Sequence, residues 1–239
     1  MASSLPPGFD LTMIPSSPPP HGVIPNFVNP VTLADPIVAV SATVSTLAFI
    51  LLLIRLYSTL RITRSASYDD GMIILAMLCS LGYVGLVVHT KDDARHGWDQ
   101  PISAYTASYF KIIFSETIVA ALGFLFAKNS ILFLLFRVFS PTRTFRYLIY
   151  GGVVWATIIS LTSVAVAGAL CAPRSGESFG SMAVAKRCTH EDIWAVVQGS
   201  LTVVLDFYIL YLPIPIVWKL QMGLKKRIGV IAIFMTGFM

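Results

Sequence analysis

Long apolar runs that contain no charged residue constrain this chain more than any other feature of its sequence. A helix needs about 20 predominantly apolar residues to cross roughly 30 Å of hydrocarbon. Runs of that kind recur along the chain, of which 56% is hydrophobic and only 12% charged, with a mean hydropathy of +0.76. The sequence therefore predicts an all-α fold, a polytopic transmembrane helix bundle that uses lipid as its solvent.

The runs divide the chain into a tail and a membrane domain. Residues 1–35 are rich in proline and contain no Lys or Arg, so we expect a disordered extracytoplasmic tail and no signal peptide. Residues 36–239 are expected to form the transmembrane domain. The predicted complete spans are about 36–57, 71–90, 112–137, 147–170 and 193–218, and a partial sixth is predicted at 228–239.

Basic residues predict how these spans are oriented. Ten Lys and Arg lie in the loops on one side of the membrane, against six on the side that carries the tail. Because Lys and Arg accumulate in cytosolic loops, we expect the N-terminus on the non-cytosolic side. We further expect the plasma membrane as the location, which makes the N-terminus extracellular. The same clustering in short loops makes nucleic acid an improbable partner, in spite of a net charge of +5. The expected partner of the spans is the lipid bilayer.

The three cysteines are too few for a disulfide-rich scaffold, and they contain no CxxC. In the predicted topology Cys171 and Cys188 both lie on the non-cytosolic side. We therefore expect a disulfide that holds residues 172–187 across the mouth of the bundle, with two unpaired thiols as the alternative. Cys79 lies inside the second span and is interpreted as a small apolar residue.

Ionisable residues inside a span are costly and are therefore candidate functional residues. Glu116 and Lys128 interrupt the third span, and Asp206 interrupts the fifth. The depths of Lys128 and Asp206 differ by about 6 Å, so we expect them to pair, with Asn129 and Ser130 supplying further hydrogen bonds. In the alternative, Lys128 extends to the interface and Asp206 is protonated or bound to a hydroxyl.

Two further patterns bear on function. Pro213 and Pro215 remove backbone donors near the end of the fifth span, which predicts a kink, and thus a plausible hinge, or an early end to the helix. The histidines show no HExxH and no paired helical spacing, and no nucleophile elbow, P-loop or dinucleotide fingerprint occurs. We therefore expect no enzyme activity, no metal site and no cofactor.

Taken together, the spans and motifs resemble the fungal rhodopsin-domain integral membrane proteins, a GPCR-like family with seven helices. The most specific piece runs from Asp206 to Trp218 and is followed by a basic cluster, Lys225, Lys226 and Arg227. The supporting pieces are Tyr68-Asp69-Asp70, the outer-loop motif of Arg95, His96 and Trp98, the segment from Lys128 to Arg137, and Cys171 with Cys188.

The resemblance implies a seven-helix fold, so the chain is expected to be a fragment or the product of a short gene model. It also implies a surface receptor or sensor of unknown ligand, whose cytosolic signalling partner could contact Lys225, Lys226 and Arg227. One alternative is an accessory protein or enzyme of fungal secondary metabolism, because relatives of this type occur in toxin-making gene clusters. Another is a transporter, with Lys128 and Asp206 along its pathway.

Overall fold

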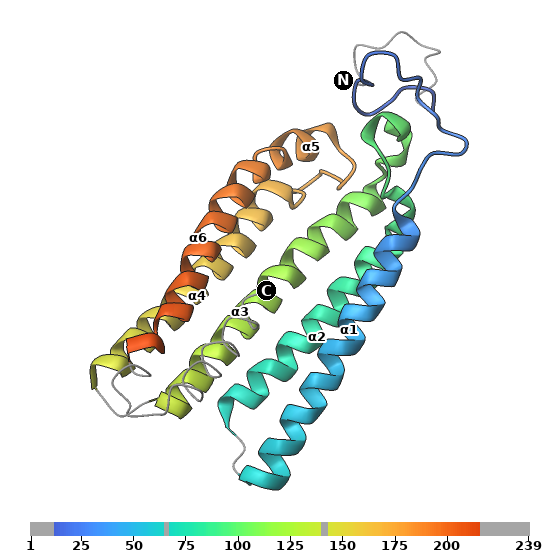
Figure 1. The fold of residues 1–239 in the computed structure, drawn as a ribbon. Helices are drawn as coiled ribbons and strands as arrows, with labels where there is room; N and C mark the ends of the chain where they lie inside the picture. Colours follow the sequence, from blue (N-terminus) through green and yellow to red (C-terminus); the bar gives the residue numbers. More distant parts are fainter. Residues whose placement is uncertain (1–11, 65–66, 140–142, 216–239) are drawn as a thin grey trace.

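The computed structural model describes residues 12–64, 67–139 and 143–215 (Figure 1). Five helical stretches in this part of the chain are long and apolar enough to cross a membrane. They are built on α1 (Ala34–Tyr57), α2 (Tyr68–His89), α3 (Ala107–Phe139), α4 (Arg143–Cys171) and α6 (Glu191–Tyr211). The chain is therefore an all-α polytopic bundle, as predicted.

Helices that follow one another in the sequence pack side by side. α1 packs against α2, α2 against α3, α3 against α4, and α4 against α6 (Figure 1). One end of the bundle carries residues 12–33, the loop between α2 and α3, and the short helix α5 (Met182–Cys188). We call residues 12–33 the cap segment and this end the cap end. The last residues of α1 and α3 and the first residues of α2 and α4 lie at the opposite end (Figure 1).

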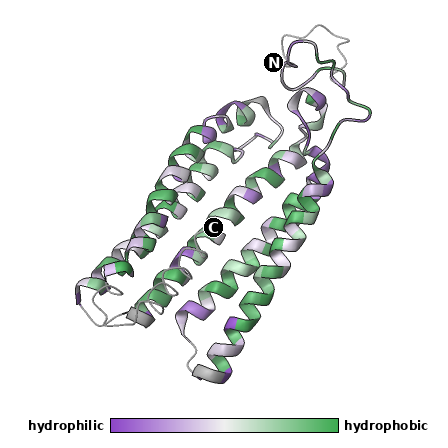
Figure 2. Ribbon diagram, viewed as in Figure 1, coloured by the Kyte–Doolittle hydropathy of each residue, from purple (hydrophilic) through white to green (hydrophobic). Residues whose placement is uncertain are grey.

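A cluster of buried hydrophobic residues lies between α3, α4 and α6, and α4 contributes residues such as Ile149 and Ala156. α1 and much of α2 instead carry exposed apolar side chains. The ribbon of both helices is predominantly coloured hydrophobic (Figure 2). In water such faces would drive aggregation, whereas in a bilayer they are the correct surface. The remaining members of the cluster are Leu132, Leu135, Phe145, Leu205, Ile209 and Leu212.

The observed helices differ from the predicted spans mainly at their ends. α1 continues through a π-helical turn, η2 (Ser58–Thr63), before Arg64 reverses the chain with a φ of 50°. α6 ends at Tyr211, and residues 216–218 of the predicted fifth span lie outside the described residues. Leu212 and Pro213 form a turn, and the backbone at Ile214 and Pro215 is helical again. The helical path is therefore interrupted at Pro213, where a backbone donor is missing. The predicted sixth span, 228–239, lies outside the described residues.

The cap segment was expected to be disordered, and here the structure differs. Three short 3-10 turns follow α2, namely η3 (Lys91–Asp93), η4 (Gly97–Asp99) and η5 (Ile102–Ala104). The backbone of the cap segment pairs with this loop, because Ser16 N donates to Gln100 O at 2.9 Å and Leu33 N donates to Ala94 O at 2.8 Å. Proline-rich composition predicted disorder, but long-range backbone hydrogen bonds to the loop order residues 12–33.

Candidate functional site

Two of the ionisable residues inside the predicted spans, Lys128 and Asp206, form an ion pair. Lys128 Nζ on α3 donates to Asp206 Oδ1 on α6, and both side chains are partly buried. The sequence allowed either a pair or a Lys128 that extends to the interface without Asp206. The structure has the pair. Because a lone charge in hydrocarbon is costly, each residue makes the presence of the other tolerable. The pair therefore links α3 to α6 within the membrane.

The neighbours expected to support this pair have other roles. Ser130 donates to the backbone oxygen of Asp69 at 3.1 Å, toward α2 and away from α6. Asn129 is buried, and its Oδ1 has no hydrogen-bond partner among the described residues. Successive residues of a helix point about 100° apart, so residues adjacent to Lys128 cannot share its face.

Close helix packing surrounds the pair. Tyr208, two residues after Asp206, donates from its hydroxyl to Leu148 O on α4 at 2.7 Å. Gly152 lets the helices approach, since a Cβ there would lie 3.0 Å from Leu132 Cδ2 and 3.1 Å from Tyr208 Cε1. Small residues permit such contact between membrane helices. α4 is thereby held against both helices that carry the charges.

A second charged group lies at the end of the bundle that is opposite the cap end. Asp69 and Asp70 begin α2, Arg55 lies in the last turn of α1, and Arg137 lies in the last turn of α3. We call these four residues the charge quartet. Arg55 NH2 is 2.9 Å from Asp69 Oδ2, while Arg137 NH1 is 3.6 Å from Asp69 Oδ1 and 3.7 Å from Asp70 Oδ2. The charges balance, and three helices are joined.

The quartet was not predicted. Asp70 also caps the start of α2, since Ser67 N donates to its Oδ2 at 3.1 Å. The two arginines were counted only as loop charges. A signal was nonetheless available, because two arginines at the ends of α1 and α3 match two aspartates at the start of the helix between them.

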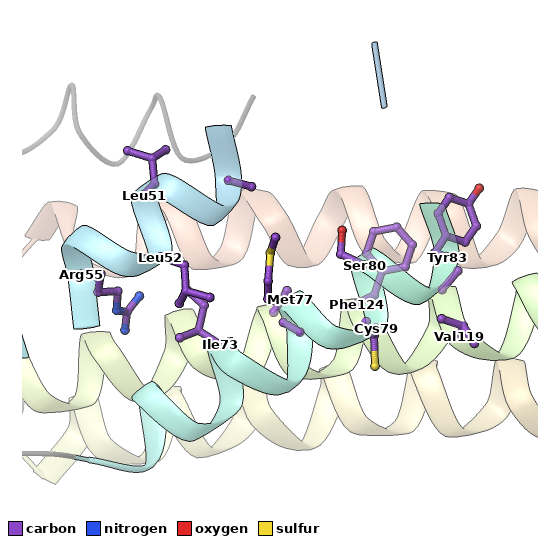
Figure 3. Close-up of a pocket in the computed structure, with 15 residues that line it drawn as sticks. Leu51, Leu52, Arg55, Ile73, Met77, Cys79, Ser80, Tyr83, Val119 and Phe124 are labelled. Atoms are coloured by element: carbon purple, nitrogen blue, oxygen red, sulfur yellow. The ribbon is translucent and has the colours of Figure 1, made fainter. Parts of the chain in front are cut away.

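A cavity of about 690 Å³ lies beside the quartet, between α1, α2 and α3 (Figure 3). Arg55 lines one end of it, and Ser80 and Tyr83 contribute hydroxyl groups further along α2. Most of the lining is apolar, with Leu52 and Phe124 among the larger side chains. This cavity was not predicted, since it depends on how three helices pack together.

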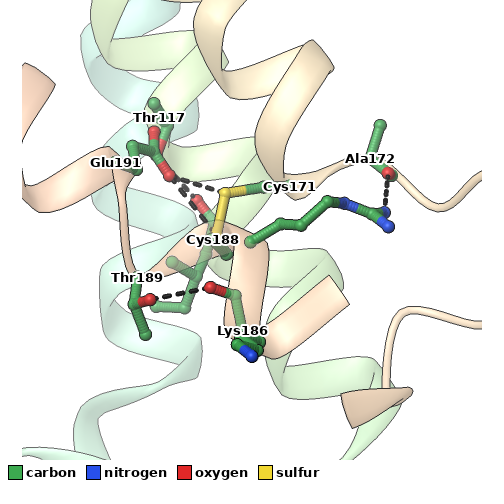
Figure 4. Close-up of a disulfide and its surroundings, with 9 residues drawn as sticks. Thr117, Cys171, Ala172, Lys186, Cys188, Thr189 and Glu191 are labelled. Atoms are coloured by element: carbon green, nitrogen blue, oxygen red, sulfur yellow. Dashed lines mark hydrogen bonds between the residues drawn. A yellow bond between two sulfur atoms is a disulfide. The ribbon is translucent and has the colours of Figure 1, made fainter. Parts of the chain in front are cut away.

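The predicted disulfide between Cys171 and Cys188 is present at the cap end (Figure 4). It joins the end of α4 to the end of α5, with Glu191 Oε2 2.8 Å from Cys171 Sγ. These three residues form a group of possible metal ligands, but both sulfur atoms are already bonded to each other. The disulfide thus serves as a structural clamp on the loop.

An ion pair fixes the same loop. Arg187 donates from NH2 to Glu177 Oε2 at 2.8 Å and from NH1 to Glu177 Oε1 at 3.1 Å. Arg174 N adds a bond of 3.1 Å to the same carboxylate. The hydrogen bonds from Arg187, followed by that from Arg174, lower the pKa of Glu177 to about 2. The carboxylate therefore stays charged at any physiological pH.

The outer-loop motif lies under the cap segment. His96 and Trp98 stack with their ring centroids 4.3 Å apart, and Arg95 forms an isolated β-bridge with Thr32. The adjacent Asp99, which was not singled out from the sequence, is buried and accepts a 2.8 Å hydrogen bond from Asn26 N. The motif therefore holds the cap segment in place.

The remaining predicted site residues lie apart from these groups. Glu116, in the cap-end half of α3, accepts a hydrogen bond of 3.4 Å from Thr90 Oγ1 at the end of α2. Pro215 follows the turn that ends α6. The basic cluster of Lys225, Lys226 and Arg227 lies outside the described residues.

The fold and these charged groups define a polytopic helical membrane protein whose helices are joined by ion pairs. A sequence model of the fungal rhodopsin domain matches residues 54–239, and the chain belongs to this family.

Two curated relatives extend this result. A SAT4 family membrane protein of Emericella nidulans is 30% identical over 131 residues, which is 54% of this chain and 34% of the relative. Fugralins biosynthesis cluster protein 2 of Gibberella zeae is 27% identical over 241 residues, which is 94% of this chain and 58% of the relative. The chain thus covers less than two thirds of either relative, and no solved structure matches it.

Proposed function

We propose that this chain is the membrane domain of a GPCR-like receptor or sensor. The observation that carries the proposal is that α3 is held by charge at two depths, through Lys128 to α6 and through Arg137 to α2. A helix held in this way cannot shift without breaking or exchanging an ion pair. Such exchange gives discrete arrangements of the kind that switching proteins use.

In this proposal the cap end faces the cell exterior and the protein lies in the plasma membrane. A disulfide persists in an oxidising compartment, which favours an external position for Cys171 and Cys188. The excess of basic residues in the loops at the opposite end favours the cytosol for that side. A cytosolic partner or anionic lipid would then meet Lys225, Lys226 and Arg227.

The test uses the natural full-length gene product in its own fungus. Asp206→Asn weakens the link to α6 and should change basal cAMP or cytosolic calcium without added ligand, at matched surface levels. Ser200→Ala is the control, since Ser200 is on the same helix, is exposed, and donates to Val196 O of its own helix. Unchanged messengers in the Asp206 variant would contradict the receptor proposal.

A second candidate is an accessory role in secondary metabolism. It is favoured by the name of the Gibberella zeae relative, a biosynthesis cluster protein that aligns with 94% of this chain. Deletion of the gene should then remove or alter one family of secreted metabolites, as measured by mass spectrometry of the culture medium. An unaltered metabolite profile under conditions in which the gene is expressed would exclude this role.

A further inference from the structure

The part of the cap segment nearest to α1 has an unusual surface. Residues 23–33 contain no charged side chain, yet all of their valine, isoleucine and leucine side chains are exposed. Ile24 is 88% exposed, Val28 is 97% exposed and Val31 is 78% exposed. Exposed apolar side chains that gather in this way mark an interaction surface.

This surface is held in a defined shape. Asn26 Oδ1 accepts hydrogen bonds from Val28 N at 3.2 Å and Asn29 N at 3.0 Å, which makes a tight local turn. The backbone of Asn26 donates to the buried carboxylate of Asp99, and Leu33 N donates to Ala94 O. The turn therefore presents Ile24 and Val28 outward while both sides of it are anchored to the loop after α2.

The surface is continuous with one that already faces lipid. Leu33 precedes the first residue of α1, and α1 carries outward-facing apolar side chains such as Val40 and Val44. Figure 1 shows the segment passing beside the cap end of α1, and Figure 2 shows hydrophobic colour along it. The exposed apolar side chains of the segment thus continue directly into those of a helix that is long and apolar enough to span a membrane.

We propose that residues 23–33 form an interfacial anchor, with Ile24, Val28 and Val31 inserted at the headgroup boundary of the leaflet on the cap side. Burial of apolar side chains would drive the insertion. Because this part of the chain is uncharged, it requires no anionic lipid. The partner is a zwitterionic bilayer surface, and the loop after α2 is the support that holds the anchor against it.

The test measures how deep this turn lies in a phosphatidylcholine bilayer. A fluorescent NBD label is attached to Ile24→Cys or Val28→Cys in the full chain, with the free cysteine removed by Cys79→Ala. Ser175→Cys is the control, because Ser175 is exposed in the loop clamped by the disulfide. An interfacial anchor places its labels about 5–10 Å deep, so nitroxide-bearing lipid should quench them severalfold more than the control.

Aqueous iodide gives the complementary reading, and should quench the control severalfold more than the label at position 24 or 28. Two results would overturn the proposal. If both labels are as open to iodide as the control, the turn lies in water. If they are closed to iodide and equally closed to the lipid quencher, another protein surface covers the turn, and the bilayer is not its partner.

Discussion

Asp69 at the start of α2 lies 2.9 Å from Arg55 at the end of α1, and its side chain is only 1% exposed. The two residues are 14 positions apart, yet they form one side of a group that also reaches α3. Breaking one member of a buried ionic group leaves an uncompensated charge, and that is far more costly than the group's net contribution to stability. The charge quartet should therefore be sensitive to single substitutions.

Asp69→Asn should lower the free energy of unfolding by about 3 kcal/mol, because Arg55 and Arg137 would then share one carboxylate. Reversible unfolding in mixed detergent micelles measures the change. Asp92→Asn is the control, since Asp92 is exposed in η3 and should have little effect. Equal stability of the two variants would show that the quartet contributes nothing to folding.

Lys128→Met and Asp206→Asn should each reduce stability and surface expression, since each leaves a partner unpaired between α3 and α6. The double variant should recover much of the loss, with a coupling energy of about 1 kcal/mol or more. Unfolding of all four proteins under one condition gives this energy. Strictly additive losses would mean that the two residues act independently.

Gly152→Val should loosen the packing of α4, because an added Cβ would meet Leu132 and Tyr208 at 3.0 and 3.1 Å. We expect a loss of about 1–3 kcal/mol. Gly168→Val on the same helix is the matched control, since apart from its chain neighbours and the adjacent backbone of α4 nothing lies within 4 Å of its Cβ position. Thermal unfolding of both variants is compared. The change in helix propensity is common to both, so the difference between their stabilities measures the packing at Gly152.

The ion pair of Glu177 and Arg187 should keep the loop between α4 and α5 ordered except in strong acid. The pKa of Glu177 is lowered from 4.5 to about 2, so its stabilising effect is complete above 4.5 and is lost as the pH falls through about 2. A spin label on Ser178→Cys, with Cys79→Ala, should gain mobility only in that range. In the Glu177→Gln background the label should be mobile at every pH tested.

Sequence reasoning recovered the features that depend on composition and on one-dimensional spacing. Apolar length located the spans that hold α1, α2, α3, α4 and α6, because crossing hydrocarbon demands about 20 apolar residues wherever the helix packs. The disulfide was foreseen because two cysteines fell on one side of the predicted membrane. The pair of Lys128 and Asp206 was one of two open readings, since depth is set by residue number but rotation about the helix axis is not.

Membrane location, helical class and the disulfide were thus determined by the sequence itself, through the cost of placing polar groups in lipid. Only the tertiary structure decided which faces of the helices came into contact. It brought Arg55 and Arg137 to the two aspartates of α2, and it turned Ser130 toward α2 instead of the ion pair. It also ordered the cap segment, whose hydrogen-bond partners lie more than 60 residues away. Such contacts depend on helix rotation and on chain reversal, which local composition does not encode.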